Sequence, residues 1–294
     1  MLSDRPDWDR EGSDWPNRDA SRFVDAGRLR WHVQVAGAGP VLLLLHGTGA
    51  GTHSWRALLP LLAQRFQVVA PDLPGHGFTS GRPAGGMNMA AMAQAVRDLL
   101  IALDLSPAII VGHSAGAAIG ARMALDAMAT PRAIIGLNPA LMPFPGIAAR
   151  LFPTLARMLF VNPFAPHIFA GIARQQGEVG RFLKRSTGSR IDAAGADYYQ
   201  RLFATSAHCA GAISMMADWD LDALAQDLPG LRTPLLLVHG ASDAMIPASS
   251  ANAAAALVPM GRVTVLEGLG HLAHEEAPDQ LATIITDFAA APVE

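Results

Sequence analysis

The 294-residue sequence predicts an α/β protein with a mostly parallel central sheet and helices on both faces. Short apolar runs alternate with helix-like segments along most of the chain. Several runs, such as residues 41–45, are continuously apolar, which is typical of strands buried on both faces. The motif Gly112-His113-Ser114-Ala115-Gly116 follows one such run and precedes a helix-like stretch, a pattern typical of a strand, a sharp turn and a helix.

The elements follow one another in a regular order. Apolar runs predict strands at 22–24, 29–35, 41–45, 67–70, 108–111 and 133–137, and later at 234–238 and 262–266. Helical spacing predicts helices at 54–65, 89–103 and 115–127, and later at 248–257 and 278–290. Proline and glycine mark the loop at 71–77.

The alternation stops between residues 139 and 216, where helices broken by prolines replace it. We expect this block to be a helical lid inserted into an α/β core of residues 22–138 and 217–294. Residues 1–21 are expected to form a mobile or loosely docked N-terminal arm, which Trp8 and Trp15 pin to the core.

Composition excludes several classes of protein. The formal net charge of −3 argues against a general nucleic-acid binder. A single cysteine, Cys209, excludes an internal disulfide and fits a reducing compartment. The sequence has no cysteine and histidine cluster with zinc-ligand spacing, no apolar run near the roughly 20 residues of a membrane span, and no apolar signal core. We therefore expect a cytoplasmic protein that needs no metal or organic cofactor.

Ser114 is the candidate nucleophile, because a serine at such a turn points its hydroxyl out of the sheet. A hydroxyl needs a base to remove its proton, and the base needs a third group to orient it. Asp243 follows the strand at 234–238, and His271 follows the strand at 262–266. Since parallel strands bring their carboxyl ends to one edge, we expect Ser114, Asp243 and His271 to form a catalytic triad.

Alternatives exist for each position. Ser114 could lie in a glycine-rich packing turn. His274 competes with His271, but Glu275 and Glu276 beside it favour a solvated surface. The acid of a triad can also follow the strand at 133–137, but this chain has Asn138 at that position. Three further acids precede a strand instead of following one: Asp218, Asp220 and Asp222.

Acyl transfer also needs N–H donors for a negatively charged oxygen. The backbone of Ala115 at the start of a helix is one candidate, and Thr48 in the loop His46-Gly47-Thr48-Gly49 is the other. A simple turn is the alternative for this loop. His113, beside the candidate nucleophile, is expected either to line the substrate pocket or to have only a packing role.

Together these motifs resemble the α/β-hydrolase superfamily over residues 41–274. More narrowly, the chain resembles the BchO-type magnesium chelatase accessory proteins of bacteriochlorophyll biosynthesis. The narrower resemblance rests on Trp15-Pro16-Asn17-Arg18, Leu29-Arg30-Trp31-His32-Val33, His46-Gly47-Thr48-Gly49-Ala50, Thr52-His53-Ser54-Trp55 and His113-Ser114-Ala115-Gly116-Ala117. It implies photosynthetic pigment synthesis as context, a tetrapyrrole as ligand and a magnesium chelatase subunit as partner, but it does not define the reaction.

The lid is expected to cover the site. It holds eight basic and three acidic residues, a net charge of +5, and seven of the eleven phenylalanines. Such a cover fits a large flat ligand with carboxylates or an anionic membrane surface. Alternatively, its aromatic residues only pack the lid onto the core. The phenylalanines expected in the substrate pocket are Phe144, Phe152, Phe160 and Phe164.

The sequence therefore predicts a serine hydrolase of the esterase type that acts through an acyl-enzyme on a large apolar, tetrapyrrole-like substrate. The alternative is a non-catalytic accessory protein that binds a porphyrin or a chelatase subunit to assist magnesium insertion. In both cases we expect a cytoplasmic location, with peripheral contact to the inner membrane through the lid as a further hypothesis.

Overall fold

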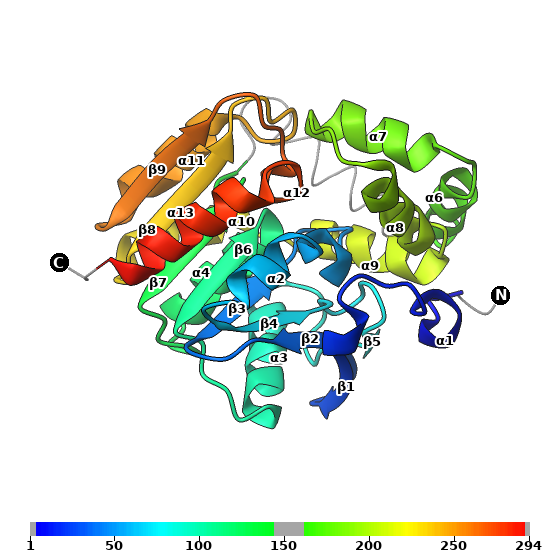
Figure 1. The fold of residues 1–294 in the computed structure, drawn as a ribbon, viewed down its shortest axis with the longest axis horizontal. Helices are drawn as coiled ribbons and strands as arrows, with labels where there is room; N and C mark the ends of the chain where they lie inside the picture. The colour runs from blue at the N-terminus through cyan, green and yellow to red at the C-terminus, as the bar shows by residue number, and fades with distance from the viewer. Residues whose placement is uncertain (1–3, 144–161, 292–294) are drawn as a thin grey trace.

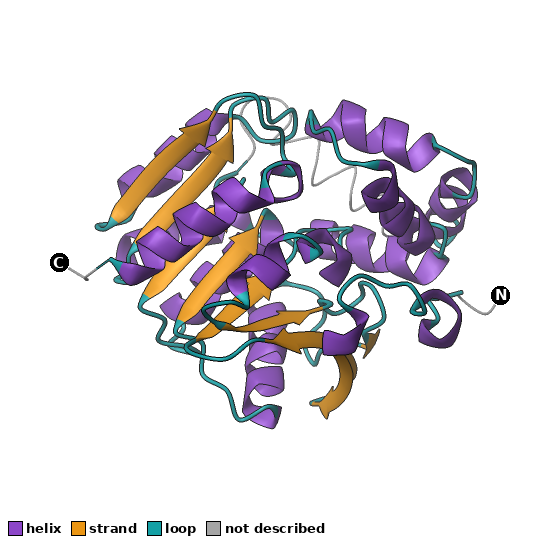
Figure 2. Cartoon of the chain, in the orientation of Figure 1, coloured by secondary structure: helices purple, strands orange, loops and turns teal. Residues whose placement is uncertain are grey.

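The computed structural model describes residues 4–143 and 162–291, which form a central sheet with helices on both faces (Figure 1). Figure 2 shows the strands running side by side between the helices. The strands are β1 (Ser21–Ala26), β2 (Leu29–Ala36), β3 (Val41–Leu45), β4 (Gln67–Pro71), β5 (Ser80–Gly81), β6 (Ile109–His113), β7 (Ala133–Leu137), β8 (Leu235–Gly240) and β9 (Gly261–Leu266).

The order of strands creates a crevice at the carboxyl edge of the sheet. The order is β1-β2-β4-β3-β6-β7-β8-β9, with β5 paired to β2. Neighbours from β4 to β9 are parallel, while β2 pairs antiparallel with β1, β4 and β5. After β3 the chain builds β4 on one side and then crosses to build β6 on the other. The carboxyl ends of β3 and β6 therefore flank a topological switch point, where ligands bind in open α/β sheets.

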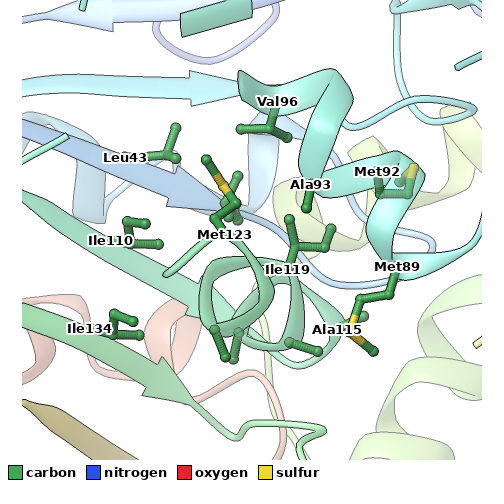
Figure 3. Close-up of a cluster of buried hydrophobic side chains, with 14 of the residues drawn as sticks. Leu43, Met89, Met92, Ala93, Val96, Ile110, Ala115, Ile119, Met123 and Ile134 are labelled. Atoms are coloured by element: carbon green, nitrogen blue, oxygen red, sulfur yellow. The ribbon is translucent and has the colours of Figure 1, made fainter. Parts of the chain in front are cut away.

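Successive side chains of the inner strands point to opposite faces of the sheet, which divides the core into two layers. Leu43, Ile110 and Ile134 belong to one buried cluster, together with residues of the helices α3 (Met89–Ala102) and α4 (Ala115–Leu125) (Figure 3). Their neighbours Leu42 and Ile109 point to the other face and pack on α2 (Leu58–Leu62) and α13 (Pro278–Ala290). Burial on both faces explains the continuous apolar runs.

Outside the lid, the other described helices are α1 (Trp8–Glu11), α10 (Leu221–Asp227), α11 (Ala248–Leu257) and α12 (Ala273–Glu276). The 3₁₀ turns there are η1 (Arg18–Ala20), η2 (Thr52–Trp55) and η3 (Leu228–Gly230). The predicted fold class and all eight predicted strands are confirmed. The single helix predicted at 54–65 is wrong, because η2 and the short α2 replace it. Pro60 lies in the first turn of α2 and has no N–H to donate, so a helix cannot extend through it from residue 54.

The N-terminal arm is docked more firmly than expected. Trp15 is buried and donates a hydrogen bond from Nε1 to Thr52 Oγ1 at 2.9 Å. Its ring packs edge-on against Phe78 and Tyr198. The arm therefore joins the core to the lid.

Four described lid helices lie between β7 and β8 in the chain: α6 (Ala165–Ala173), α7 (Glu178–Thr187), α8 (Ala193–Phe203) and α9 (Ser206–Ala217). Figure 1 shows them packed together beyond the carboxyl ends of the parallel strands. Within the described part of the chain, no helix combines the length and apolar character that crossing a bilayer requires.

The start of α4 lies unusually close to the end of β3. A Cβ atom added to Gly116 would lie 2.0 Å from the Leu45 carbonyl oxygen, and one added to Gly112 would lie 2.3 Å from the Ala117 nitrogen. No side chain fits at such distances, so both glycines of the Gly-x-Ser-x-Gly motif are needed for backbone contact.

This contact predicts a specific cost for one methyl group. Gly116→Ala should lower the free energy of unfolding by about 1–3 kcal/mol or more, because the clash is with backbone. Gly171→Ala on α6 is the matched control, since a Cβ there meets no atom within 4 Å. The control should be neutral or stabilising by up to about 1 kcal/mol. Denaturant titration compares the two, and equal stabilities would contradict the close approach.

Candidate active site

Ser114 occupies a strained turn between β6 and α4. Its backbone has φ 50° and ψ −116°, outside the regions that residues with a side chain normally adopt. The Ser114 N–H donates to the Leu137 carbonyl at 3.0 Å, which anchors the turn to β7. The hydroxyl does not cap α4, and the residue is half-buried. The turn therefore places at the carboxyl end of β6 a serine whose hydroxyl is not used to cap the following helix.

Asp243 and His271, which follow β8 and β9, are in direct contact. His271 Nδ1 lies 2.7 Å from Asp243 Oδ2. Asp243 Oδ1 accepts hydrogen bonds from the backbone N–H groups of Met245 and Ile246 at 2.8 and 3.0 Å. Burial works against the charge of Asp243, but the hydrogen bond and charge of His271 outweigh it and lower the pKa of Asp243. Asp243 is therefore an ionised carboxylate that holds the histidine ring.

Asn138 is a further residue of the site, although the sequence analysis considered its position only as an alternative place for the acid. It is buried at the end of β7, with Nδ2 2.9 Å from Asp243 Oδ2 and 3.2 Å from the Gly270 carbonyl. Its amide therefore joins the two loops that carry the acid and the base. Its place at the carboxyl end of a strand beside β8 was the available signal, because donors there can reach Asp243.

His113 links the Ser114 turn to the His271 loop. Its Nε2 lies 3.0 Å from the His271 carbonyl oxygen. Burial, together with the adjacent His274 and His271 rings, holds the pKa of His113 well below its ordinary value. The ring is therefore neutral, and it carries its proton on Nε2 because a carbonyl can only accept. Its packing against His271 agrees with the packing alternative for His113; a pocket-lining role stays a prediction.

Two of the three predicted triad residues, His271 and Asp243, are hydrogen-bonded to each other, and Ser114 follows directly after His113, which contacts His271. Among the side-chain hydrogen bonds of the described residues, Ser114 Oγ makes none to His271. The link between the serine and the acid–base pair passes through the neighbouring His113.

The loop after β3 lies beside Ser114. A Cβ atom on Gly47 would be 3.1 Å from the Ser114 Cβ. Among the described residues, the backbone N–H groups of Thr48 and Ala115 donate no hydrogen bond. The Thr48 hydroxyl contacts Met215 Sδ of α9 at 3.4 Å, which brings the lid onto this loop. Within the described residues, both predicted oxyanion donors are therefore unpaired.

The predicted pocket phenylalanines are only partly described. Phe144, Phe152 and Phe160 lie outside the described residues. Phe164, just before α6, is 59% exposed, and its place in a pocket stays a prediction. Among the described lid phenylalanines, Phe203 contacts the site loop, since its ring would lie 2.7 Å from a Cβ on Gly49.

The expectation of a solvated surface at His274 and Glu275 is wrong. His274 is fully buried between the rings of Trp55 and His113, at centroid distances of 4.6 and 4.4 Å. The Glu275 carboxylate is buried, pairs with Arg56 and accepts a 2.8 Å hydrogen bond from the Tyr199 hydroxyl. Residues that are distant in the chain bury His274 and Glu275, so the residues next to them in the sequence could not reveal this burial.

In the described ranges 4–143 and 162–291, no group of three or more histidine, cysteine, aspartate or glutamate side chains is arranged to hold a metal ion. The described groups with catalytic potential are the serine, the histidine and the carboxylate. They match the requirements of acyl transfer through a covalent intermediate.

Comparisons with known proteins agree with this fold. The family described as the alpha/beta hydrolase fold matches residues 40–278, so the chain belongs to that family. It is 40% identical over 278 residues to the magnesium-chelatase 30 kDa subunit of Rhodobacter capsulatus, covering 94% of this chain and 96% of that protein. It is 31% identical over 260 residues to a pimeloyl-[acyl-carrier protein] methyl ester esterase of Aromatoleum aromaticum, covering 84% and 97%.

Solved structures share the fold. A hydrolase from Pseudomonas aeruginosa has a TM-score of 0.73 and 25% identity, covering 92% of this chain and 98% of its own. A thermophilic esterase from Thermogutta terrifontis has a TM-score of 0.69 and 21% identity, covering 91% and 97%.

Buried neutral histidines predict that the fold is sensitive to acid. Burial lowers the pKa of His274 from 6.5 to about 3, and six other histidines are shifted in the same direction. Between pH 6.5 and about pH 3, His274 is protonated in the unfolded chain and neutral in the folded chain. For His274 this lowers the free energy of unfolding by up to about 1.4 kcal/mol per pH unit as the pH falls from 6.5 toward 3, and the other six histidines act in the same direction.

His274→Phe should make the loss of stability between pH 6.5 and 4 less steep by about 1.4 kcal/mol per pH unit. The half-buried His167 on α6 supplies the control, since His167→Phe makes the same replacement at a different position. Urea unfolding at several pH values measures both slopes. A slope for His274→Phe equal to that of wild type would show that His274 does not resist protonation.

Proposed function

We propose that the chain is a serine hydrolase of the esterase type. The observation that carries this proposal is the 2.7 Å contact between His271 and an ionised Asp243, beside a serine held in a strained turn. An imidazole oriented by a carboxylate is the base that a serine hydroxyl needs.

In the proposed reaction, Ser114 Oγ attacks the ester carbonyl and forms a C–O bond while His271 Nε2 takes the hydroxyl proton. Asp243 keeps Nδ1 protonated and stabilises the imidazolium. Substrate binding has to bring Ser114 Oγ and His271 Nε2 within hydrogen-bond distance, since such contacts are often long before the substrate binds.

The negative oxygen of the tetrahedral intermediate accepts hydrogen bonds from the N–H groups of Thr48 and Ala115. His271 then gives its proton to the departing alkoxide, which leaves an acyl-serine. A water molecule attacks this ester with His271 again as base, releasing the carboxylic acid and restoring the serine. No step consumes a cofactor.

The relatives support different parts of the proposal. The Aromatoleum aromaticum protein is named as a methyl ester esterase, which agrees with ester cleavage. The Rhodobacter capsulatus protein is named as a chelatase subunit, which agrees with a tetrapyrrole-related role. We therefore propose a large apolar ester, with a tetrapyrrole-like body, as the class of substrate.

The second candidate function is a non-catalytic accessory that binds a porphyrin or a magnesium chelatase subunit and assists metal insertion. The name and the 40% identity of the Rhodobacter capsulatus relative favour it. Under this hypothesis the site binds its ligand without cleaving it.

Fluorophosphonate labelling tests the catalytic proposal. Wild-type protein should form a covalent adduct, detected by intact mass, because an activated serine attacks phosphorus. Ser114→Ala should not react, and His271→Ala should react at least about 100-fold more slowly because the base is lost. A wild-type protein that resists the probe under native conditions would contradict an active triad.

A reconstituted magnesium chelatase assay separates the two functions. The hydrolase proposal predicts that Ser114→Ala abolishes any effect of the chain on magnesium protoporphyrin formation. The accessory hypothesis predicts equal stimulation by wild type and Ser114→Ala. Absorbance titration with protoporphyrin gives the matching binding data for both proteins.

The outer part of the lid carries exposed apolar residues beside basic ones. Ile168 and Ile172 on α6 are 57% and 48% exposed, and Phe182 on α7 is 60% exposed. Arg181, Lys184 and Arg185 lie in the same helix as Phe182 and are exposed. Apolar side chains among cations suit the interface of an anionic bilayer, so we propose this surface as the site of peripheral membrane contact.

Vesicle sedimentation tests the membrane contact. Wild type should bind phosphatidylglycerol vesicles at low salt and lose binding at high salt, because the attraction is partly electrostatic. Phe182→Ser combined with Ile168→Ser should reduce binding several-fold. Ile101→Ser on α3 is the control, because Ile101 is 64% exposed outside the lid. Equal loss in both variants, or no binding by wild type, would reject this surface.

A further inference from the structure

The lid is joined to the loops of the acid and the base through one short turn. This lid turn comprises residues 187–189, at the end of α7. Thr187 is the last residue of α7, and Ser189 lies in the connection to α8. Both are buried. Gly188 has φ 71°, and a Cβ atom there would lie 2.2 Å from the Ser242 carbonyl oxygen. The lid turn is therefore wedged against the residue next to Asp243.

The lid turn also holds the backbone on both sides of the His271 side chain. The His271 N–H donates to the Thr187 carbonyl at 2.8 Å. The Leu272 N–H donates to the Ser189 hydroxyl, also at 2.8 Å. The same Thr187 carbonyl accepts a longer hydrogen bond of 3.4 Å from Ala244 N–H, next to Asp243.

A second set of contacts continues this connection. Glu276 accepts hydrogen bonds from Arg190 N–H beside the lid turn and from Gly270 N–H, both at 2.8 Å. Leu272 packs in the apolar cluster of the lid, with Leu183 of α7 and Tyr199 of α8. The residues flanking His271 thus belong structurally to the lid, while the His271 carbonyl is held by His113 of the core.

From these contacts we propose that the lid turn is a positioning element for the acid–base pair, with Ser189 as its key side chain. This inference rests on the proposed hydrolase function. The core fixes the carbonyl of His271, and the lid fixes its N–H, so the ring keeps its direction toward Asp243 only while the lid turn is in place. A ligand or surface that shifts α7 would then change the reactivity of Ser114 without touching it.

Ser189→Ala tests this role, and Ser186→Ala is the matched control. Ser186 lies three residues earlier, and its hydroxyl bonds only to carbonyls of its own helix, at Phe182 and Leu183. Ser189→Ala leaves the buried Leu272 N–H without its acceptor. We expect kcat on a chromogenic ester to fall roughly 10- to 100-fold with little change in KM, since a small misplacement of a catalytic group has effects of this size.

Two further readouts distinguish positioning from general damage. The pH profile of kcat should shift in Ser189→Ala and not in Ser186→Ala, because the environment of the base has changed. The low-field proton resonance of His271 Nδ1, assigned by its loss in Asp243→Asn, should weaken or broaden only in Ser189→Ala. This resonance reports the contact between His271 and Asp243 without any substrate.

The outcomes separate the two proposals. If Ser189→Ala keeps the wild-type kcat, pH profile and His271 resonance, the lid turn does not position the base, even though the hydrolase stands. If wild type resists fluorophosphonate, the hydrolase proposal fails, and the resonance alone decides the positioning role. An unchanged resonance in Ser189→Ala then overturns it, and a selective loss supports it.

Discussion

The contact between the start of α4 and the end of β3 is the constraint on which the site depends. Gly116 lets the helix backbone touch the Leu45 carbonyl, and the chain can reach that contact only through a sharp turn at Ser114. The turn leaves the first N–H of α4 without a partner inside the helix. It also sets Ser114 against Gly47, so the loop that carries Thr48 lies beside the nucleophile. The proposed nucleophile and the proposed oxyanion donors therefore depend on one backbone contact.

The acid and the base depend on a different arrangement, in which loops from several strands support one another. Asn138 of the β7 end holds Asp243, and His113 of the β6 end holds the His271 backbone. None of these contacts is local in the chain. Asp243 and the His271 carbonyl are thus held by the core, and the His271 N–H is held by the lid. This division is consistent with an enzyme whose cover affects its chemistry.

The sequence was sufficient for the fold because each inner strand is apolar throughout, and such runs suit burial between two layers of helices. It was also sufficient for the contact of Asp243 with His271, since both follow parallel strands. It could not reveal that Glu275 is buried, because its partners Arg56 and Tyr199 come from distant segments. The sequence indicated that Trp15 anchors the N-terminal arm, but it could not name the partner, because the hydrogen bond to Thr52 spans 37 residues. Patterns along the chain report which face of an element is buried, and not which distant polar groups meet.

We propose that one serine, one imidazole and two backbone N–H groups converge on the same reacting atom. A crystal structure of the chain after reaction with a small phosphonate ester tests this convergence. We expect phosphorus bonded to Ser114 Oγ, the phosphoryl oxygen within hydrogen-bond distance of the Thr48 and Ala115 nitrogens, and His271 Nε2 in contact with a remaining oxygen of the adduct. An adduct whose phosphoryl oxygen points away from both nitrogens, or phosphorus attached to another residue, would contradict it.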